Sequence, residues 1–229
     1  MSTFSSVAEQ ICNNCGHSPI FEESYTLYAD LLTNPDFLNQ ATFLSVDIET
    51  TGLEASAAII EIAAVKYQAG KVIGEFSSLV NPHRPIPSFI ENLTGINNQM
   101  VATAPPITQV LTDFLTFADF PNTILLAHNA RFDTRFLMLA CQQAGFTWPT
   151  PASIDTVLFS RAVLPKPMVA NHRLSTLAQH FQISTPQAHR ALADAYTCLT
   201  LFHHLLQLSA KTPIPPEVFT VLSAEDVWD

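Results

Sequence analysis

A short apolar stretch that carries two acids, residues 43–49, constrains this chain more than any other. It runs Phe-Leu-Ser-Val-Asp-Ile-Glu and is followed by Thr-Thr-Gly, and its apolar residues predict a strand that enters the core. Because side chains alternate along a strand, Asp47 and Glu49 point to the same face. Burying two neighbouring carboxylates is costly unless a cation compensates them. The stretch therefore indicates either a site for divalent metal or a strand end exposed to solvent.

The composition favours a folded globular protein. Of the 229 residues, 48% are hydrophobic and 13% are charged, which suits one well-buried domain with extensions. No apolar run reaches the ~20 residues of a membrane helix, and no signal peptide is recognisable, so we expect a cytoplasmic protein without membrane attachment. The net charge of −10 argues against a generally basic surface, although Lys and Arg concentrate between residues 131 and 190. These cations indicate either a local basic patch or scattered solvated charges.

The four cysteines do not point to a metal or redox centre. Cys141 and Cys198 lie singly in apolar, helical surroundings and are expected to be buried thiols. Cys12 and Cys15 form a lone CxxC pair, which cannot complete a four-ligand zinc site, although His17 is close by. A zinc or redox role is therefore the less favoured interpretation.

Hydrophobic periodicity predicts an α/β domain. Three strands joined by short turns, at residues 43–48, 58–67 and 72–80, indicate an antiparallel meander. Helices and a further strand alternate after it, which predicts a mixed sheet with helices on both faces. The predicted helices are residues 88–93, 107–118, 132–144, 174–181 and 191–208, the fourth strand is residues 123–127, and residues 153–163 form another short element.

We divide the chain into a domain, residues 41–210, flanked by two extensions. Residues 1–40 are expected to be a helical extension that is too small for its own core and packs against the domain or a partner. Residues 211–229 are expected to be a tail interrupted by prolines.

Three further residues of the domain add to the two acids of the first strand. Asp133 lies near a helix start, where an acid often caps the helix. Asp194 is a solitary charge in an alanine-rich run, and His189 precedes it by five residues. Each has a structural interpretation of its own, but four clustered acids are untenable without metal. With two divalent cations they form the arrangement for in-line phosphoryl displacement.

With these residues the chain resembles the DEDDh 3′–5′ exonucleases, the DnaQ-like family typified by the proofreading epsilon subunit of bacterial DNA polymerase III. The resemblance covers about residues 42–207 and implies a ribonuclease H-like fold. It rests on residues 46–52 with 59–65, residues 127–133 and residues 189–195, supported by residues 92–96.

The resemblance implies a two-metal exonuclease. Asp47, Glu49, Asp133 and Asp194 would hold two Mg²⁺ or Mn²⁺ ions, and His189 would be the general base that activates the attacking water. The substrate would be the 3′ end of single-stranded or frayed nucleic acid, and the product a nucleoside 5′-monophosphate.

The same resemblance assigns the residues around the acids. Glu61 would support the metal ligands from behind, and Asp155 is either a further family position or a helix start. The pocket for the 3′-terminal nucleotide would comprise Thr50, Thr51, Gly52 and Leu53. The penultimate nucleotide would contact His128, Asn129 and Phe132. The phosphates would contact Arg131, Arg173 and Arg190.

The sequence leaves the polymer and the setting open. DNA in proofreading or repair, with a DNA polymerase or another replication or repair subunit as partner, is the favoured hypothesis. One alternative is an RNA exonuclease similar to RNase T or oligoribonuclease, because the five catalytic residues do not distinguish the sugars. The other is a binding or adaptor subunit that docks through the apolar residues 25–38.

Overall fold

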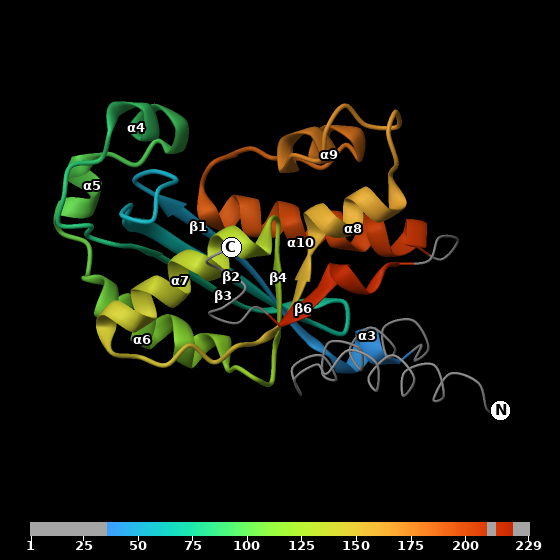
Figure 1. The fold of residues 1–229 in the computed structure, drawn as a ribbon, viewed down its shortest axis with the longest axis horizontal. Coiled ribbons are helices and arrows are strands. Elements are labelled where there is room, and N and C mark those ends of the chain that lie inside the picture. The colour runs from blue at the N-terminus through green and yellow to red at the C-terminus, as the bar shows by residue number, and fades with distance from the viewer. Residues whose placement is uncertain (1–35, 210–213, 222–229) are drawn as a thin grey trace, which may run out of the picture.

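A mixed sheet forms the centre of the computed structural model, which describes residues 36–209 and 214–221. The six strands of these residues lie in the order β3-β2-β1-β4-β5-β6 (Figure 1). β1 and β2, β2 and β3, and β5 and β6 pair antiparallel, whereas β1, β4 and β5 are parallel to one another. The predicted meander is confirmed. The strands are β1 Thr42–Thr50, β2 Ile59–Gln68, β3 Lys71–Leu79, β4 Ile124–Ala127, β5 Ala152–Asp155 and β6 Phe219–Val221.

Helices cover both faces of the sheet, as predicted. Alternation along β1 sends Phe43 to one face, where it packs against Phe202 of α10, and Leu44 to the other, where it joins the cluster around Phe114 of α6. The helices are α3 Phe37–Gln40, α4 Ser88–Thr94, α5 Asn98–Ala102, α6 Ile107–Ala118, α7 Ala130–Ala144, α8 Thr156–Val163, α9 Leu174–His180 and α10 Ala191–Ser209, with a 3-10 turn at Pro216–Val218.

Some local predictions are confirmed and others are refined. α4 ends at Gly95, whose φ of 71° is the left-handed conformation that a glycine cap supplies. Residues 153–163 comprise the end of β5 and the whole of α8. The region predicted as a tail contributes β6, a strand of three residues that is too short to leave a periodic pattern. Residues 1–35, which include most of the predicted extension, lie outside the described residues.

None of the described helices is long and apolar enough to span a membrane. Cys141 and Cys198 are buried free thiols, as predicted. Burial raises the pKa of Cys198 to about 12, so that this thiol stays protonated.

Candidate active site

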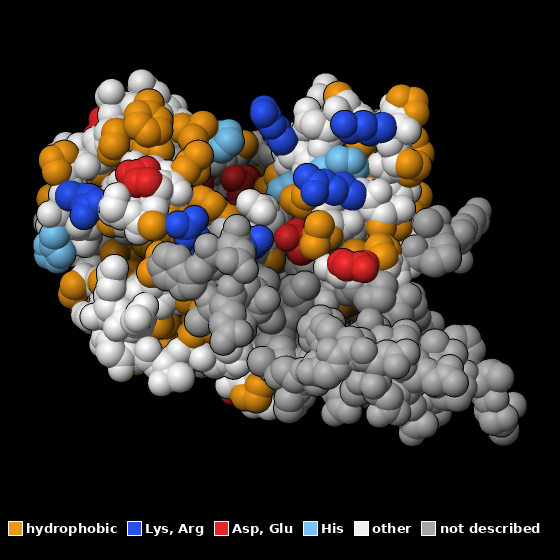
Figure 2. Space-filling model, viewed as in Figure 1, with side chains coloured by type: hydrophobic (Ala, Val, Ile, Leu, Met, Phe, Trp, Pro, Cys, Tyr) orange, Lys and Arg blue, Asp and Glu red, His pale blue; other side chains and the backbone are white. Residues whose placement is uncertain are grey.

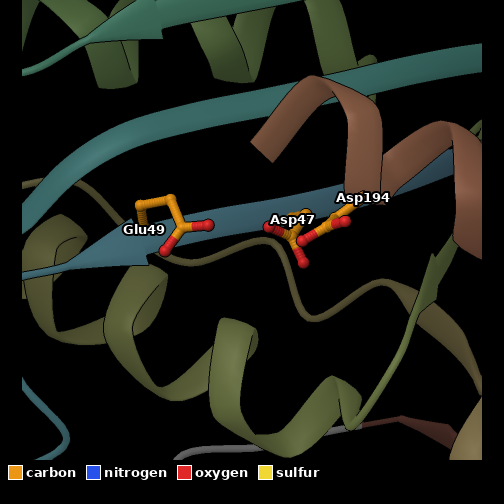
Figure 3. A group of neighbouring side chains, drawn as sticks. All are labelled: Asp47, Glu49 and Asp194. Carbon is orange, nitrogen blue, oxygen red and sulfur yellow. The ribbon is translucent and has the colours of Figure 1, made fainter. Parts of the chain in front are cut away.

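Strand β1 and the start of α10 position the central acids. Asp47 and Glu49 lie on the face of β1 that α10 covers, two and four residues beyond Ser45. The Ser45 hydroxyl donates a hydrogen bond to the carbonyl oxygen of Ala195 at 2.7 Å, which fixes where α10 crosses the strand. Asp194 is therefore brought beside Asp47, and Figure 3 shows the two carboxylates pointing toward each other.

Three carboxylates converge at this crossing. Oxygen atoms of Asp47, Glu49 and Asp194 all lie within 4.8 Å of one another, and all three residues are partly buried. Burial, followed by the charges of the neighbouring acids, raises the pKa of Asp47 well above its usual range and that of Glu49 to about 8. The two acids of β1 are thus not an exposed strand end. A set of hard oxygen donors under mutual repulsion fits Mg²⁺ or Mn²⁺.

Asp133 lies beside this group rather than within it. It is in the first turn of α7 and is 3% exposed. Burial raises its pKa, and hydrogen bonds from its own backbone N–H and from that of Ile48 oppose the rise. Among the neighbouring charges, that of Asp133 has the largest effect on the pKa of Asp47. Asp133 is therefore near enough to Asp47 for the two charges to interact, and its role as a metal ligand stays a prediction.

His189 lies at the rim of the group. Its side chain is exposed, and its backbone adopts a φ of 65°, in the left-handed region. This turn lets its backbone N–H donate to Asp194 Oδ2 at 3.1 Å. The charge of His189 also lowers the pKa of Asp194, against the larger effect of burial. The imidazole is thus accessible to solvent, and its charge interacts with the carboxylate of Asp194.

Glu61 fastens the segment that carries His189 and Asp194. It is 1% exposed in β2 and pairs with Glu49 across the sheet. Its carboxylate accepts hydrogen bonds from Arg190 Nη2 at 2.7 Å, from Arg190 Nε at 3.2 Å and from the Ala191 N–H at 3.0 Å. Glu61 thus ties the start of α10 to β2, while Arg190, predicted as a phosphate contact, is engaged by this ion pair.

The residues predicted to contact the terminal nucleotide, residues 50–53, comprise the end of β1 and the tight loop that follows it. Thr50 Oγ1 donates to the Gly52 carbonyl at 2.6 Å, and Thr51 bonds Ala58 through both its N–H and its hydroxyl. These contacts bury both threonines. Leu53, four residues beyond Glu49, is 77% exposed, so the loop holds an apolar side chain in solvent.

The three residues predicted to contact the penultimate nucleotide differ in how far their side chains are already engaged by other groups. Burial lowers the pKa of His128 to about 4, so it is neutral. Its Nδ1 lies 2.9 Å from Thr156 Oγ1 and its Nε2 lies 3.0 Å from the His172 carbonyl, so both ring nitrogens are already engaged. Asn129 is exposed, and the Phe132 ring packs 5.0 Å from that of Phe136. The nucleotide contacts of these three residues stay predictions.

Asp155 starts two helices. Its carboxylate accepts hydrogen bonds from the backbone N–H groups of Val157 and Leu158 in α8 and of Asn129 and Ala130 at the start of α7. The helix-start interpretation therefore accounts for this acid, which joins two segments next to the site.

We expect Asp155→Ala to lower the free energy of unfolding by about 2–4 kcal/mol, because four backbone N–H donors, one buried and three partly buried, lose their acceptor. Asp155→Asn should retain part of this stability, since asparagine also caps helices. Urea denaturation of both variants checks this. A loss below about 0.5 kcal/mol in the alanine variant, the range of ordinary surface substitutions, would contradict the role.

We expect Glu49→Gln to stabilise the metal-free protein at pH 8. The carboxyl of Glu49 keeps its proton up to about pH 8 in the fold, whereas it ionises near 4.5 in the unfolded chain. The wild type therefore loses stability relative to the variant as pH rises from 4.5 to 8, on the order of 1–3 kcal/mol after discounting for partial solvation. Thermal unfolding in EDTA at pH 5 and pH 8 measures the difference. Equal midpoint shifts at the two pH values would contradict it.

Comparisons with known proteins agree with this geometry. A family model described as RNase_T, exonuclease, matches residues 44–202. The chain is 41% identical over 171 residues to the DNA polymerase III PolC-type protein of Oceanobacillus iheyensis, and 36% identical over 180 residues to the 3′-5′ exonuclease DinG of Bacillus subtilis. These matches span 74% and 78% of this chain but only 12% and 19% of the relatives, which are much longer.

Solved structures give the same fold. Exonuclease X in complex with 5′ overhanging duplex DNA is 28% identical, with a TM-score of 0.60, and the match covers 75% of this chain and 95% of that one. E. coli Exonuclease I in complex with a dT13 oligonucleotide, at 20% identity and a TM-score of 0.67, supports the fold alone, and the match covers 75% of this chain and 42% of that one. The predicted ribonuclease H-like fold is confirmed, and the chain belongs to the exonuclease family that its motifs resemble.

Proposed function

We propose that this chain is a metal-dependent 3′→5′ exonuclease that releases nucleoside 5′-monophosphates. The observation that carries the proposal is the convergence of Asp47, Glu49 and Asp194, with Asp133 beside them and His189 at the rim. These five residues come from β1, α7, α10 and the turn before α10. They are the five residues that the family resemblance implies.

The acids fit a pair of divalent cations, Mg²⁺ or Mn²⁺. Asp47, Glu49 and Asp194 would hold one ion, and Asp47 with Asp133 the other. When bound, such ions supply charge stabilisation to the attacking and leaving oxygens of an in-line displacement. They would also relieve the repulsion that raises the pKa values of the carboxyls in their absence.

The residues of the chain itself supply the proton transfer and the positioning. The His189 imidazole accepts a proton from the water that attacks the terminal phosphodiester. The bond from phosphorus to the 3′ oxygen of the penultimate nucleotide then breaks. Glu61 holds Arg190 and the first residue of α10, and so keeps His189 and Asp194 in register with β1.

DNA is the substrate that we favour. The relatives at 36–41% identity carry DNA polymerase III and 3′-5′ exonuclease names, and Exonuclease X was solved with duplex DNA bearing a 5′ overhang. The exposed Leu53 next to the acids is suited to contact the last base. A DNA polymerase or repair factor is the partner class that these relationships suggest.

The direction of digestion and the polymer are tested together. Oligonucleotides of about 20 residues, labelled at the 5′ end and made as DNA or RNA of one sequence, are incubated with Mg²⁺ or Mn²⁺. We expect a ladder that shortens from the 3′ end, with faster degradation of DNA. If the 5′ label is released as a mononucleotide from the start of the reaction, digestion begins at the 5′ end and the proposal is overturned. Faster digestion of RNA would overturn the choice of DNA.

A further inference from the structure

Charge is strongly segregated along this acidic chain. Residues 156–193 contain no Asp or Glu, although the whole chain has 20 acids and a net charge of −10. The segment does carry cations and titratable imidazoles. They are Arg161, Lys166, Arg173, Arg190, His172, His180 and His189. Positive and negative charges are thus separated along the chain, and a region of one sign of charge attracts ligands of the opposite sign.

Three of these cations lie on one projection, which we call the basic lobe and define as residues 156–180. Arg161 is in the last turn of α8, Lys166 is in the loop that follows, and Arg173 immediately precedes α9. All three side chains are exposed. Burial lowers the pKa of His172, and the charges of Arg161 and Lys166 lower it further, so these two charges act on the same place.

The basic lobe is firmly joined to the catalytic side of the sheet. His128, directly after β4, reaches the lobe through the Thr156 hydroxyl and the His172 carbonyl, and Asp155 bonds the start of α8 and the start of α7 together. In Figure 2 blue side chains lie over α8 and α9, on one side of a hollow that has red carboxylates at its base, and other blue side chains lie on the opposite half of this face.

The opposite side of this hollow has a different character. Phe89 and Leu93 of α4 are 63% and 50% exposed, and Leu53 of the loop after β1 is 77% exposed. Figure 2 shows hydrophobic side chains over α4, across from the cations. A cationic wall facing an apolar wall matches single-stranded nucleic acid, whose phosphates and bases lie on different sides of the strand.

We propose that the basic lobe binds the backbone phosphates of single-stranded DNA upstream of the 3′ end, with Arg161, Lys166 and Arg173 as the phosphate contacts and the bases turned toward α4. This inference rests on the proposed function, since it extends that substrate beyond the two nucleotides at the acids. It also explains how a chain with a net charge of −10 holds a polyanion. The cations are concentrated where the strand passes.

Binding of the strand and hydrolysis of its end test the lobe separately. Fluorescence anisotropy with 5′-labelled dT of about 20 nucleotides, in Ca²⁺ and over a range of salt, compares the wild type with R161Q/K166Q/R173Q. We expect at least a tenfold weaker Kd and a salt slope reduced by about 2, because each lost contact to a single strand removes about 0.7 from the slope. Hydrolysis of a dinucleotide without a 5′ phosphate, which has no backbone phosphate upstream of the bond that is cut, should be unchanged in R161Q/K166Q, the variant that keeps Arg173.

A matched pair separates the lobe from total charge. Lys166→Glu and Lys71→Glu change the net charge equally, and Lys71, the first residue of β3, is also exposed. We expect at least threefold weaker binding for the first variant than for the second. Three results would each overturn the proposed role of the basic lobe. They are equal Kd values for the pair, an unchanged salt slope in the triple variant, and an equal loss of activity on the dinucleotide. If the wild type binds DNA through the lobe but releases no nucleotide, the role of the basic lobe is supported and the proposed exonuclease activity is refuted.

Discussion

Replacing Asp47 by Asn should lower the rate of nucleotide release by about 10³-fold or more. Asp47 lies within 4.8 Å of Glu49 and Asp194, and its charge interacts with that of Asp133, so it would serve both proposed ion sites. Losing a group that stabilises transition-state charge typically costs about 10²–10³-fold even when a single hydrogen-bond donor is removed. Single-turnover hydrolysis of a labelled oligonucleotide in Mg²⁺ measures the loss.

Asp113→Asn is the matched control for this substitution. Asp113 is an exposed acid of α6, on the helical layer that covers the other face of the sheet, and its amide variant should hydrolyse DNA at the wild-type rate. Without metal, Asp47→Asn should unfold at a higher temperature than the wild type, because a repelled buried charge is removed. A variant at Asp47 that is inactive because it is unfolded would contradict this account, as would one with wild-type activity.

Replacing His189 by Gly should lower the rate by about 10²–10⁴-fold, the usual contribution of a general base. Glycine suits the backbone φ of 65° at this position, so the variant removes the imidazole without straining the turn. Added free imidazole should restore part of the rate, since the exposed site is open to solvent. This rescue is a result that a merely structural histidine would not give.

His83→Gly provides the control, since His83 is also exposed and has a φ of 50°. It should neither lose activity nor respond to imidazole. Full activity of His189→Gly, or a loss that imidazole cannot restore at any concentration, would assign the general base elsewhere.

The strand with two acids was predictable because it depends on a local rule. Alternation alone places Asp47 and Glu49 on one face, and the turn after it confines Leu53 nearby. The long helix of Asp194 was equally clear from its apolar pattern. What alternation could not supply is the crossing point of α10, which the hydrogen bond between Ser45 and Ala195 fixes across a separation of 150 residues.

Interactions between distant residues account for the parts that the sequence did not predict. Glu61 and Arg190 are 129 residues apart, and Arg190 taken alone suggested a phosphate contact. Asp155 left two interpretations open until its four N–H partners were known. The basic lobe did have a sequence signal, because Lys and Arg concentrate between residues 131 and 190 and no acid lies in residues 156–193, but the sequence left scattered solvated charges as the alternative.

Titration with Mn²⁺ followed by electron paramagnetic resonance tests the central claim most directly, because free Mn²⁺ gives a signal that bound Mn²⁺ loses. We expect the wild type and Asp113→Asn to bind two ions per chain in the presence of a mononucleotide, and Asp47→Asn to bind neither tightly. Mg²⁺ should displace the bound Mn²⁺. Equal Mn²⁺ binding by the wild type and Asp47→Asn, or no binding by the wild type, would contradict a metal centre built on the acids of β1.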